Sequence, residues 1–175
     1  GRDALLTASF EGIHLFRQNG DGGWSGKQIA RGNPDPWPQC GASDISVGRL
    51  GSRRFVCTIA PWHGNQVVVY QERDGNWRRS VIDDALAHGH ALITADLNGD
   101  GLDEIIAGCR EGARSVNIYS ASGGRTAEWT RTILDDGGMP GAACDVADLN
   151  GDGRPDIVCI GGNLLKWYEN VASGV

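Results

Sequence analysis

The chain has 175 residues, enough to bury one good hydrophobic core. Its 27 glycines and the lack of any apolar run of about eighteen residues exclude a helical membrane span and favour an all-β protein with many turns. The formal net charge of −6 argues against nucleic acid as a partner. Residues 1–3 lack the apolar run of a signal peptide, which is compatible with a mature form whose leader has been removed. A secreted or extracellular location is expected.

A repeat of about 50 residues runs through the whole chain. Tryptophans that open similar segments recur at spacings of 53 and 52 residues: Trp24, Trp77 and Trp129. A second aromatic series closes successive apolar runs: Phe16, Tyr70, Tyr119 and Tyr168. Because the tryptophans recur at the period of the repeat, we expect them to be core or packing residues.

Each complete repeat is expected to fold into four β-strands, because short β-branched runs alternate with turn residues. In the third repeat these strands are expected near residues 91–95, 104–108, 115–120 and 130–134. A repeated four-stranded antiparallel unit of this length is typical of a β-propeller blade. The prediction is a single all-β propeller segment with a partial blade 1–39, blades 40–87 and 88–137, and a partial blade 138–175.

Both terminal repeats are expected to be incomplete. The first begins at residues 4–8, which match a second strand, and the last ends at residues 166–170, which match a third strand. The chain then supplies three, four, four and three strands, about three and a half blades of an expected seven-bladed ring. Since open sheet edges invite pairing, we expect another chain, a second copy or further protein to close the ring.

Two acidic loops, Asp96–Glu104 and Asp148–Asp156, begin 52 residues apart. In each loop, positions 1, 3, 5 and 9 carry side-chain oxygens, a glycine at position 6 permits a sharp turn, and position 7 can offer its carbonyl. Converging, mostly anionic oxygens suit calcium, which accepts about six to eight oxygen ligands. A plain hairpin turn is the alternative. The predicted ligands of two calcium ions are Asp96, Asn98, Asp100, Leu102 and Glu104 in the first loop, and Asp148, Asn150, Asp152, Arg154 and Asp156 in the second.

These loops differ from EF-hands, because position 12 is Ala107 in one copy and Cys159 in the other, where an EF-hand has a bidentate Glu. The residues that follow each loop form short β-branched runs, so each loop is expected to join two strands. Repeat two carries the carboxylate-free segment Gly48–Arg54 at the corresponding place. We therefore expect two calcium sites in the chain.

On the loop Asp96–Glu104 with the following Ile105–Gly108, and on Asp148–Asp156 with Ile157 and Val158, the chain resembles the FG-GAP/VCBS repeat family. The resemblance covers essentially the whole chain, although repeats one and two carry it weakly. It implies a propeller with integrin-α-like calcium loops. Members of the family include integrin α head domains, fungal lectins and propeller domains of secreted enzymes, among them the sugar-acting lyase aldos-2-ulose dehydratase.

Three histidines are expected on the face opposite the calcium loops. His63 lies between a second and a third strand, whereas His88 and His90 lie where a fourth strand passes to the next first strand. Two imidazoles at i and i+2 of an extended segment can point to one side, and a third from a neighbouring blade would complete a zinc site. Plain polar loop residues and a metal-free sugar site are the alternatives. His14 is expected to be a structural strand residue.

Trp62 and Trp37 add aromatic surface to the same face. An exposed Trp beside His63, Asn65 and Asp35 can stack on a sugar ring while the polar groups hydrogen-bond it. A tryptophan packed beneath its own loop is the alternative. The predicted ligand-binding residues are thus Trp62, Asn65, Trp37 and Asp35.

The five cysteines lack a CxxC pair, so a cysteine zinc site is not expected. Cys57, Cys109 and Cys159 fall in corresponding strands and are expected to be small buried hydrophobes, which leaves the redox compartment open. The pairs Asp83-Asp84 and Asp135-Asp136 recur in equivalent positions and are expected to form turns.

No catalytic residue is assigned, because the chain carries no Ser-His-Asp set, phosphate loop or dinucleotide fingerprint. We predict a calcium-binding propeller module that recognises carbohydrate or protein on the face opposite the calcium loops. The alternative is the propeller part of a zinc-dependent lyase acting on a sugar-derived ketone, with zinc on the three histidines polarising the carbonyl. A purely structural segment of a larger secreted protein is the third hypothesis.

Overall fold

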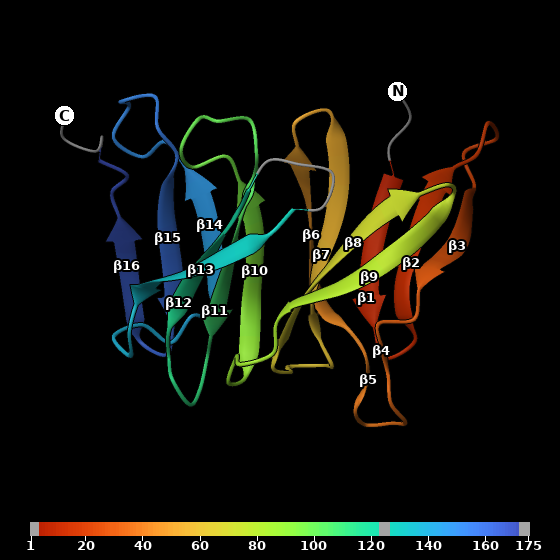
Figure 1. Ribbon diagram of the computed structural model, residues 1–175, viewed down its shortest axis with the longest axis horizontal. Coiled ribbons are helices and arrows are strands. Elements are labelled where there is room, and N and C mark those ends of the chain that lie inside the picture. The colour runs from red at the N-terminus through yellow and green to blue at the C-terminus, as the bar shows by residue number, and fades with distance from the viewer. Residues whose placement is uncertain (1–3, 123–126, 172–175) are drawn as a thin grey trace.

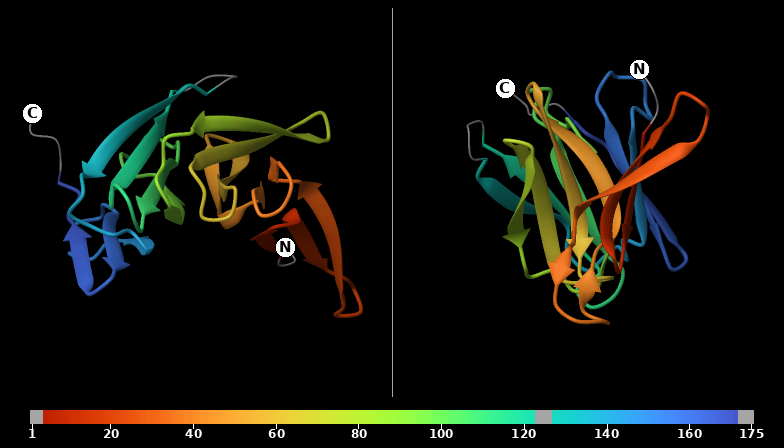
Figure 2. Two further views of the ribbon diagram at one scale, coloured as in Figure 1. Left: turned by 90° about the horizontal axis from the view of Figure 1, so that it is seen from below. Right: turned by 90° about the vertical axis from the view of Figure 1, so that its right-hand side faces the viewer.

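The computed structural model of the protein describes residues 4–122 and 127–171, and every regular element in them is a β-strand (Figure 1). The all-β prediction is confirmed. The strands form four principal antiparallel sheets and one short two-stranded ribbon. Figure 2 shows that the sheets follow one another along an arc, with the two ends of the chain on opposite arms.

The first sheet consists of β1 (Ala4–Ser9), β2 (Gly12–Gln18) and β3 (Trp24–Ala30), and the ribbon of β4 (Asn33–Pro34) and β5 (Cys40–Gly41). The second sheet consists of β6 (Ser43–Leu50), β7 (Arg53–Ala60), β8 (Gln66–Arg73) and β9 (Asn76–Asp83). The third consists of β10 (Gly89–Ala95), β11 (Glu104–Cys109), β12 (Val116–Ala121) and β13 (Trp129–Asp135). The fourth consists of β14 (Ala143–Ala147), β15 (Asp156–Gly161) and β16 (Leu164–Tyr168).

The four sheets thus contain three, four, four and three strands, as the repeat predicts. Their registers also correspond, because the recurring aromatic residue always pairs with the same position of the preceding strand. The pairs are Leu5–Phe16, Val56–Tyr70, Ile105–Tyr119 and Ile157–Tyr168. This register allows residues of different sheets to be compared position by position.

Hydrophobic side chains are buried between successive sheets, in three clusters. Val68 and Tyr70 pack with Ile13 between the first and second sheets, and Phe55 packs with Ile105 between the second and third. Strand β11 is buried at every residue, because neighbouring sheets cover both of its faces. Its continuous apolar run therefore replaces the alternating pattern of a half-exposed strand.

The recurring tryptophans are packing residues in two of three repeats. Trp129 packs edge-on against Phe55, with ring centroids 5.5 Å apart, and Trp77 packs against the cluster between the first two sheets. Trp24 is 46% exposed, so the expectation of a buried residue is wrong there. The reason is that Trp77 and Trp129 each pack against the preceding sheet, and no described sheet precedes the first.

Asp83 and Asp135 do form turns, but they also join sheets. Asp83 Oδ1 accepts a hydrogen bond from the amide of Ala85, and Asp135 Oδ1 accepts one from Gly138, each at 2.7 Å. The second carboxylate oxygen of each residue binds a tyrosine of the next sheet. The prediction of turn formers was therefore correct but incomplete.

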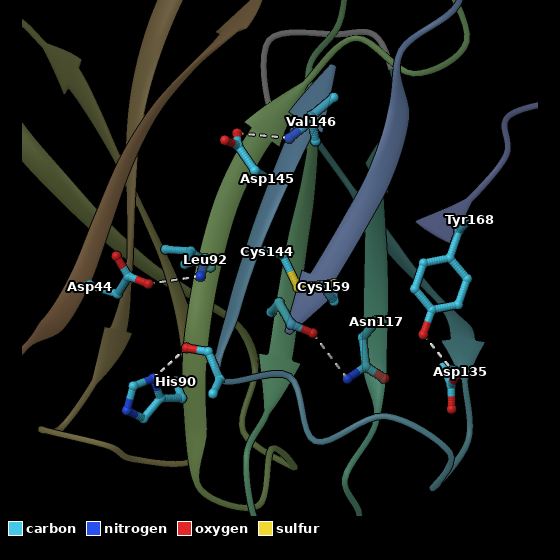
Figure 3. The surroundings of a disulfide bond; sticks show 12 residues. Asp44, His90, Leu92, Asn117, Asp135, Cys144, Asp145, Val146, Cys159 and Tyr168 are labelled. Atoms are coloured by element: carbon cyan, nitrogen blue, oxygen red, sulfur yellow. Dashed lines mark hydrogen bonds between the residues drawn. A yellow bond between two sulfur atoms is a disulfide. The ribbon is translucent and has the colours of Figure 1, made fainter. Parts of the chain in front are cut away.

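Cys144 and Cys159 form a disulfide across the paired strands β14 and β15 (Figure 3). The prediction that Cys159 is a plain buried hydrophobe is wrong, because its directly paired residue is a second cysteine whose Cα lies 4.1 Å away. Cys57 and Cys109 are buried free thiols as predicted, and Cys40 is a half-buried free thiol. Burial raises the pKa of the Cys57 thiol far above its ordinary value, so it stays protonated.

Candidate calcium loops and the opposite aromatic face

The two acidic loops lie at the same end of the molecule. They connect β10 to β11 and β14 to β15, and Figure 1 shows both at the end opposite the β7–β8 and β11–β12 turns. Each loop follows the first strand of its sheet, as the repeat predicts. The loops of adjacent sheets therefore lie beside one another.

The first loop is folded around the side chain of Asp96. Asp96 Oδ1 accepts hydrogen bonds from the amides of Gly99 (2.8 Å) and Asp100 (3.1 Å), and Oδ2 accepts one from Gly101 (2.9 Å). Gly99 and Gly101 have φ angles of 76° and 81°, which favour glycine because it has no Cβ. The second oxygen-bearing residue, Asn98, accepts from the amide of Asp100 at 2.9 Å.

The second loop repeats this arrangement. Asp148 Oδ1 accepts from the amides of Gly151 (2.7 Å) and Asp152 (3.1 Å), and Oδ2 accepts from Gly153 (2.9 Å). Asn150 Oδ1 accepts from the amide of Asp152 at 3.0 Å. Two loops with the same hydrogen-bond scaffold thus hold their oxygen-bearing side chains in the same order.

The loops differ in which carboxylate lies beside the Asn side-chain amide. In the first, Asn98 Nδ2 lies 3.2 Å from Glu104 Oε1. In the second, Asn150 Nδ2 lies 3.0 Å from Glu169 Oε1, at the end of β16. Asp156 is one methylene shorter than Glu104, and its oxygens instead accept hydrogen bonds from the amides of Leu149 and Asn170.

Sequence reasoning missed Glu169, because it lies thirteen residues beyond the loop and outside the repeated motif. The signal that was present is the replacement of Glu104 by the shorter Asp156 at position 9. The backbone hydrogen bond from Asn170, above all, lowers the pKa of Asp156. Asp156 is therefore already stabilised as a carboxylate, and Glu169 is the carboxylate that lies beside the Asn150 amide.

The donor set of the first loop fits calcium. Burial, followed by the charges of Asp100 and Asp96, raises the pKa of Glu104. A cation among these carboxylates would offset both the loss of solvation and the repulsion between the negative charges. Asn98 Nδ2 now lies 3.2 Å from both Asp100 Oδ2 and Glu104 Oε1. Turning the amide over would place its oxygen in that position and complete an all-oxygen set, as calcium requires. The amide of Asp100 would then lose its contact with Asn98 Oδ1 and keep its hydrogen bond to Asp96 Oδ1.

Within residues 4–122 and 127–171, no three His, Cys, Asp or Glu side chains are arranged to hold a metal ion. The hydrogen bonds explain this, because backbone and Asn amides bind the carboxylate oxygens of both loops. Ion binding at either loop would need the Asn side chain to turn. The backbone scaffold around Asp96 and Asp148 can stay as it is.

The first loop also joins two sheets. The amide of Asp103 donates to the carbonyl of Arg49 at 2.7 Å, and the amide of Arg49 donates to Asp103 Oδ2 at 2.8 Å. Leu102 packs against the core between these sheets and bridges to Leu50. The loop is thus fixed against the β6–β7 turn of the preceding sheet.

The second loop is linked to the first through Asn170. Its Nδ2 donates to the carbonyl of Leu97 at 2.7 Å and to the carbonyl of Pro155 at 3.1 Å. The Arg154 guanidinium donates from Nε to the carbonyl of Asn170 and forms an ion pair with Asp152. Ordering one loop would therefore help to order the other.

The opposite end carries a row of four rings in contact with one another. Phe10 stacks on Trp62 with centroids 5.2 Å apart, Trp62 on His63 at 5.1 Å, and His63 lies 4.7 Å from His90. These residues come from the β1–β2 turn, the β7–β8 turn and β10, so the row crosses three sheets. Phe10 is 40% and Trp62 44% exposed, which leaves an aromatic surface open to a ligand.

The structure brings together two of the three predicted zinc ligands. His90 Nδ1 donates to the carbonyl of Ala142 at 2.7 Å (Figure 3), and Arg110 Nη1 lies 3.4 Å from Nε2. Partial burial and the charges of His90 and Arg110 lower the pKa of His63. Both ring nitrogens of His90 thus have protein neighbours. The hydrogen bond of His88 is made by its backbone, because its carbonyl accepts from the amide of Arg110.

Of the other predicted ligand-binding residues, Asn65 lies in the same β7–β8 turn as Trp62 and His63, and Asp35 lines a pocket together with Phe10. Trp37 is 74% exposed at the tip of the β4–β5 ribbon. Asp35 accepts a hydrogen bond from Asn33, and Asn65 donates to the carbonyl of Asp84 at 2.7 Å. Phe10 was missed by sequence reasoning, because an aromatic residue in a turn carries no periodic signal.

His14 pairs with Thr7 and Gln28 within the first sheet, consistent with a strand residue. Among the residues that the structure describes, no helix is long and apolar enough to cross a membrane.

Comparison with known proteins matches residues 96–159 to the FG-GAP-like repeat. The chain is 26% identical over 152 residues to aldos-2-ulose dehydratase of Phanerodontia chrysosporium, covering 76% of this chain and 16% of that protein. It is 28% identical over 131 residues to integrin alpha pat-2 of Caenorhabditis briggsae, covering 69% of this chain and 11% of that protein. Residues 96–159 therefore form an FG-GAP-like repeat, in a chain distantly similar to aldos-2-ulose dehydratase and integrin alpha.

Proposed function

We propose that this chain is a calcium-binding segment of a β-propeller, with each principal sheet forming a complete or partial blade. The observation that carries the proposal is the identical hydrogen-bond scaffold of the two loops around Asp96 and Asp148. FG-GAP repeats commonly bind calcium, and their presence implies propeller blades. The ten loop residues predicted from the sequence, together with Glu169, are the proposed ligands.

The arc of sheets supports a ring that this chain fills only in part. Its first sheet has no strand beyond β1, and its fourth has none beyond β16, among the described residues. Exposed Leu165 and Trp167 on β16 add apolar surface at that edge. Further protein, another chain or a second copy would cover such an edge.

The proposed role of the propeller is recognition of carbohydrate or protein on the face opposite the calcium loops. The row of Phe10, Trp62, His63 and His90 supports this, because Phe10 and Trp62 remain 40% and 44% exposed and aromatic side chains can contact the apolar faces of sugar rings. Arg110 and Glu111, which pair at 3.0 Å beside the row, add hydrogen-bonding groups. The disulfide and the similarity to integrin alpha favour an extracellular location.

The second candidate is the propeller part of a zinc-dependent lyase. The similarity to aldos-2-ulose dehydratase favours it. The contacts of His90 favour recognition instead, because Arg110 lies at the nitrogen that zinc would need. Zinc content of the purified protein, with and without His90→Ala, separates the two candidates.

Calorimetric titration with calcium tests the proposal. We expect two ions per chain, and loss of one ion in each of Asp96→Asn and Asp148→Asn. Asp136→Asn, which changes an exposed carboxylate in a turn, is the matched control and should keep both. Unchanged stoichiometry in both loop variants would overturn the calcium assignment.

Glycan-array binding of the calcium-loaded protein tests recognition separately. Trp62→Ala should abolish binding, whereas Trp24→Ala should keep it, since Trp24 is similarly exposed but lies on β3, away from the row. Equal loss in both variants would contradict a site at the row.

A further inference from the structure

We infer that a cleft between the first and second sheets is a binding site for a small organic anion. The cleft has a volume of about 730 Å³ and lies at the same end as the calcium loops, beside the β6–β7 turn. Arg17, Arg53, Arg54 and Arg73 line it, together with the indole of Trp77. It is separate from both the calcium loops and the aromatic row.

The cleft exists because a small side chain stands where the next interface has a large one. In the registers of the two sheets, Ala4 pairs with Arg17 as Phe55 pairs with Gln71, so Ala4 occupies the position of Phe55. At the next interface, Phe55 fills the space against Trp129. At this interface, Trp77 holds the position of Trp129 but faces the small Ala4 across the cleft.

A missing loop enlarges the same space. Between the second and third sheets, the long loop before β11 inserts Leu102 into the core and fixes Asp103 to Arg49. The β6–β7 connection is the tight turn Gly51-Ser52, which inserts nothing toward the first sheet. The interface between the second and third sheets thus closes this space with a phenyl ring and a loop, and the interface between the first and second sheets has neither.

The residues that replace the loop reverse its charge. Val56 corresponds to Ile105 in register, so Arg54 stands where the calcium loop has Asp103. Four arginines line the cleft against one carboxylate, Glu72, on a chain with a net charge of −6. In the described part of the chain, Arg17 and Arg54 form no ion pair, so their charges can act on a ligand.

The chemistry of the lining defines the class of ligand. Guanidinium groups bind carboxylate, phosphate and sulfate through paired N–H donors. The floor of Leu6, Leu15, Ile29 and Val56, with Trp77 beside it, suits a ring or an apolar body. The volume lies in the usual range of small-molecule sites. The geometry therefore points to an anionic group carried on a ring, such as a sugar acid, a sugar phosphate or a sugar sulfate.

Nuclear magnetic resonance titration of the calcium-loaded chain tests this site. The probes are glucuronate, glucose 6-phosphate and glucose 6-sulfate, which all carry the charged group at C6, with neutral glucose as the control. We expect at least one anion to shift the Trp77 indole and Arg54 Nε signals saturably, with a Kd of about 1 mM or tighter. The anion that binds best identifies the charged group. No saturable shift with any anion, or an equal shift with glucose, overturns the proposal.

Three variants locate the binding. Arg54→Gln should weaken it at least tenfold, and Ala4→Phe should abolish it by filling the cleft. Arg78→Gln removes the same charge from an exposed position of β9 outside the cleft, and it should change affinity less than twofold. Equal weakening by Arg54→Gln and Arg78→Gln would show general attraction to the surface and overturn the assignment. Since the arginine variants change only exposed side chains, this comparison holds even where Ala4→Phe disturbs folding.

Discussion

The phenol of Tyr119 donates a 2.7 Å hydrogen bond to Asp83 Oδ2, which joins β12 of the third sheet to the end of β9 in the second. One repeat later, Tyr168 makes the same 2.7 Å contact with Asp135 (Figure 3). A cation completes each contact, Arg131 at 3.2 Å from Asp83 and Lys166 at 2.7 Å from Asp135. These clusters hold adjacent sheets together independently of the calcium loops.

The interface between the first and second sheets lacks this tyrosine–aspartate contact. We therefore predict that removing the hydroxyl has different effects on stability at Tyr119 and at Tyr70. Ala30 holds the repeat position of Asp83, and the buried Tyr70 hydroxyl has no hydrogen-bond partner in the described chain, although Arg79 and Thr58 lie near it. Tyr119→Phe should destabilise the fold by about 1–3 kcal/mol, because the hydroxyl binds a charged, mostly buried carboxylate. Tyr70→Phe should be neutral or stabilising. Urea unfolding of both variants measures the difference, and equal losses would contradict it.

The Asp135 cluster predicts how stability depends on pH. Although burial acts in the opposite direction, hydrogen bonds from Lys166, Tyr168 and the amide of Gly138 lower the pKa of Asp135 below its usual 3.8. A lowered native pKa contributes stability above the unfolded value of about 3.9, and this is lost as pH falls through the native pKa. Asp135→Asn should therefore be less stable than the parent at pH 7, and the gap should shrink below pH 4. A gap independent of pH would contradict the ion-pair account.

The Cys144–Cys159 disulfide should stabilise the fourth sheet, which lacks a covering sheet on its outer side among the described residues. It closes a segment with a sequence separation of 15, for which chain entropy predicts about 3 kcal/mol. The double change Cys144→Ser, Cys159→Ser should lower the free energy of unfolding by that order, and Cys40→Ser should leave it unchanged. Hydrogen exchange that rises first in β14–β16 would locate the effect. Uniform exchange across all sheets would argue against it.

Glu169 should distinguish the two calcium loops. Glu169 lies beside the Asn150 amide as Glu104 lies beside the Asn98 amide. Glu169→Gln should therefore weaken the calcium affinity of the second loop about tenfold and leave that of the first loop unchanged. Glu104→Gln should do the reverse, and Glu128→Gln, an exposed residue far from either loop in the sequence, serves as the control. Two-site calorimetric titration resolves the affinities. Normal binding at the second loop of Glu169→Gln would remove this residue from the ligand set.

The amino-acid sequence by itself determined the strands, their grouping in sheets of three, four, four and three, and the two loops around Asp96 and Asp148. Those features follow from local patterns, since β-branched runs, turn glycines and ligand spacing all act within a few residues. The 50-residue period predicted equivalent packing positions in successive repeats, as Trp77 and Trp129 show.

Only the tertiary structure decided which residues meet across sheets. Asp83 with Tyr119, Asn150 with Glu169, and Cys144 with Cys159 are pairs whose members carry no local signal of one another. The cleft beside Ala4 is likewise a property of two sheets in contact, since an alanine in a strand is unremarkable alone. Such contacts depend on how separate strands pack and register, which no single stretch of sequence encodes.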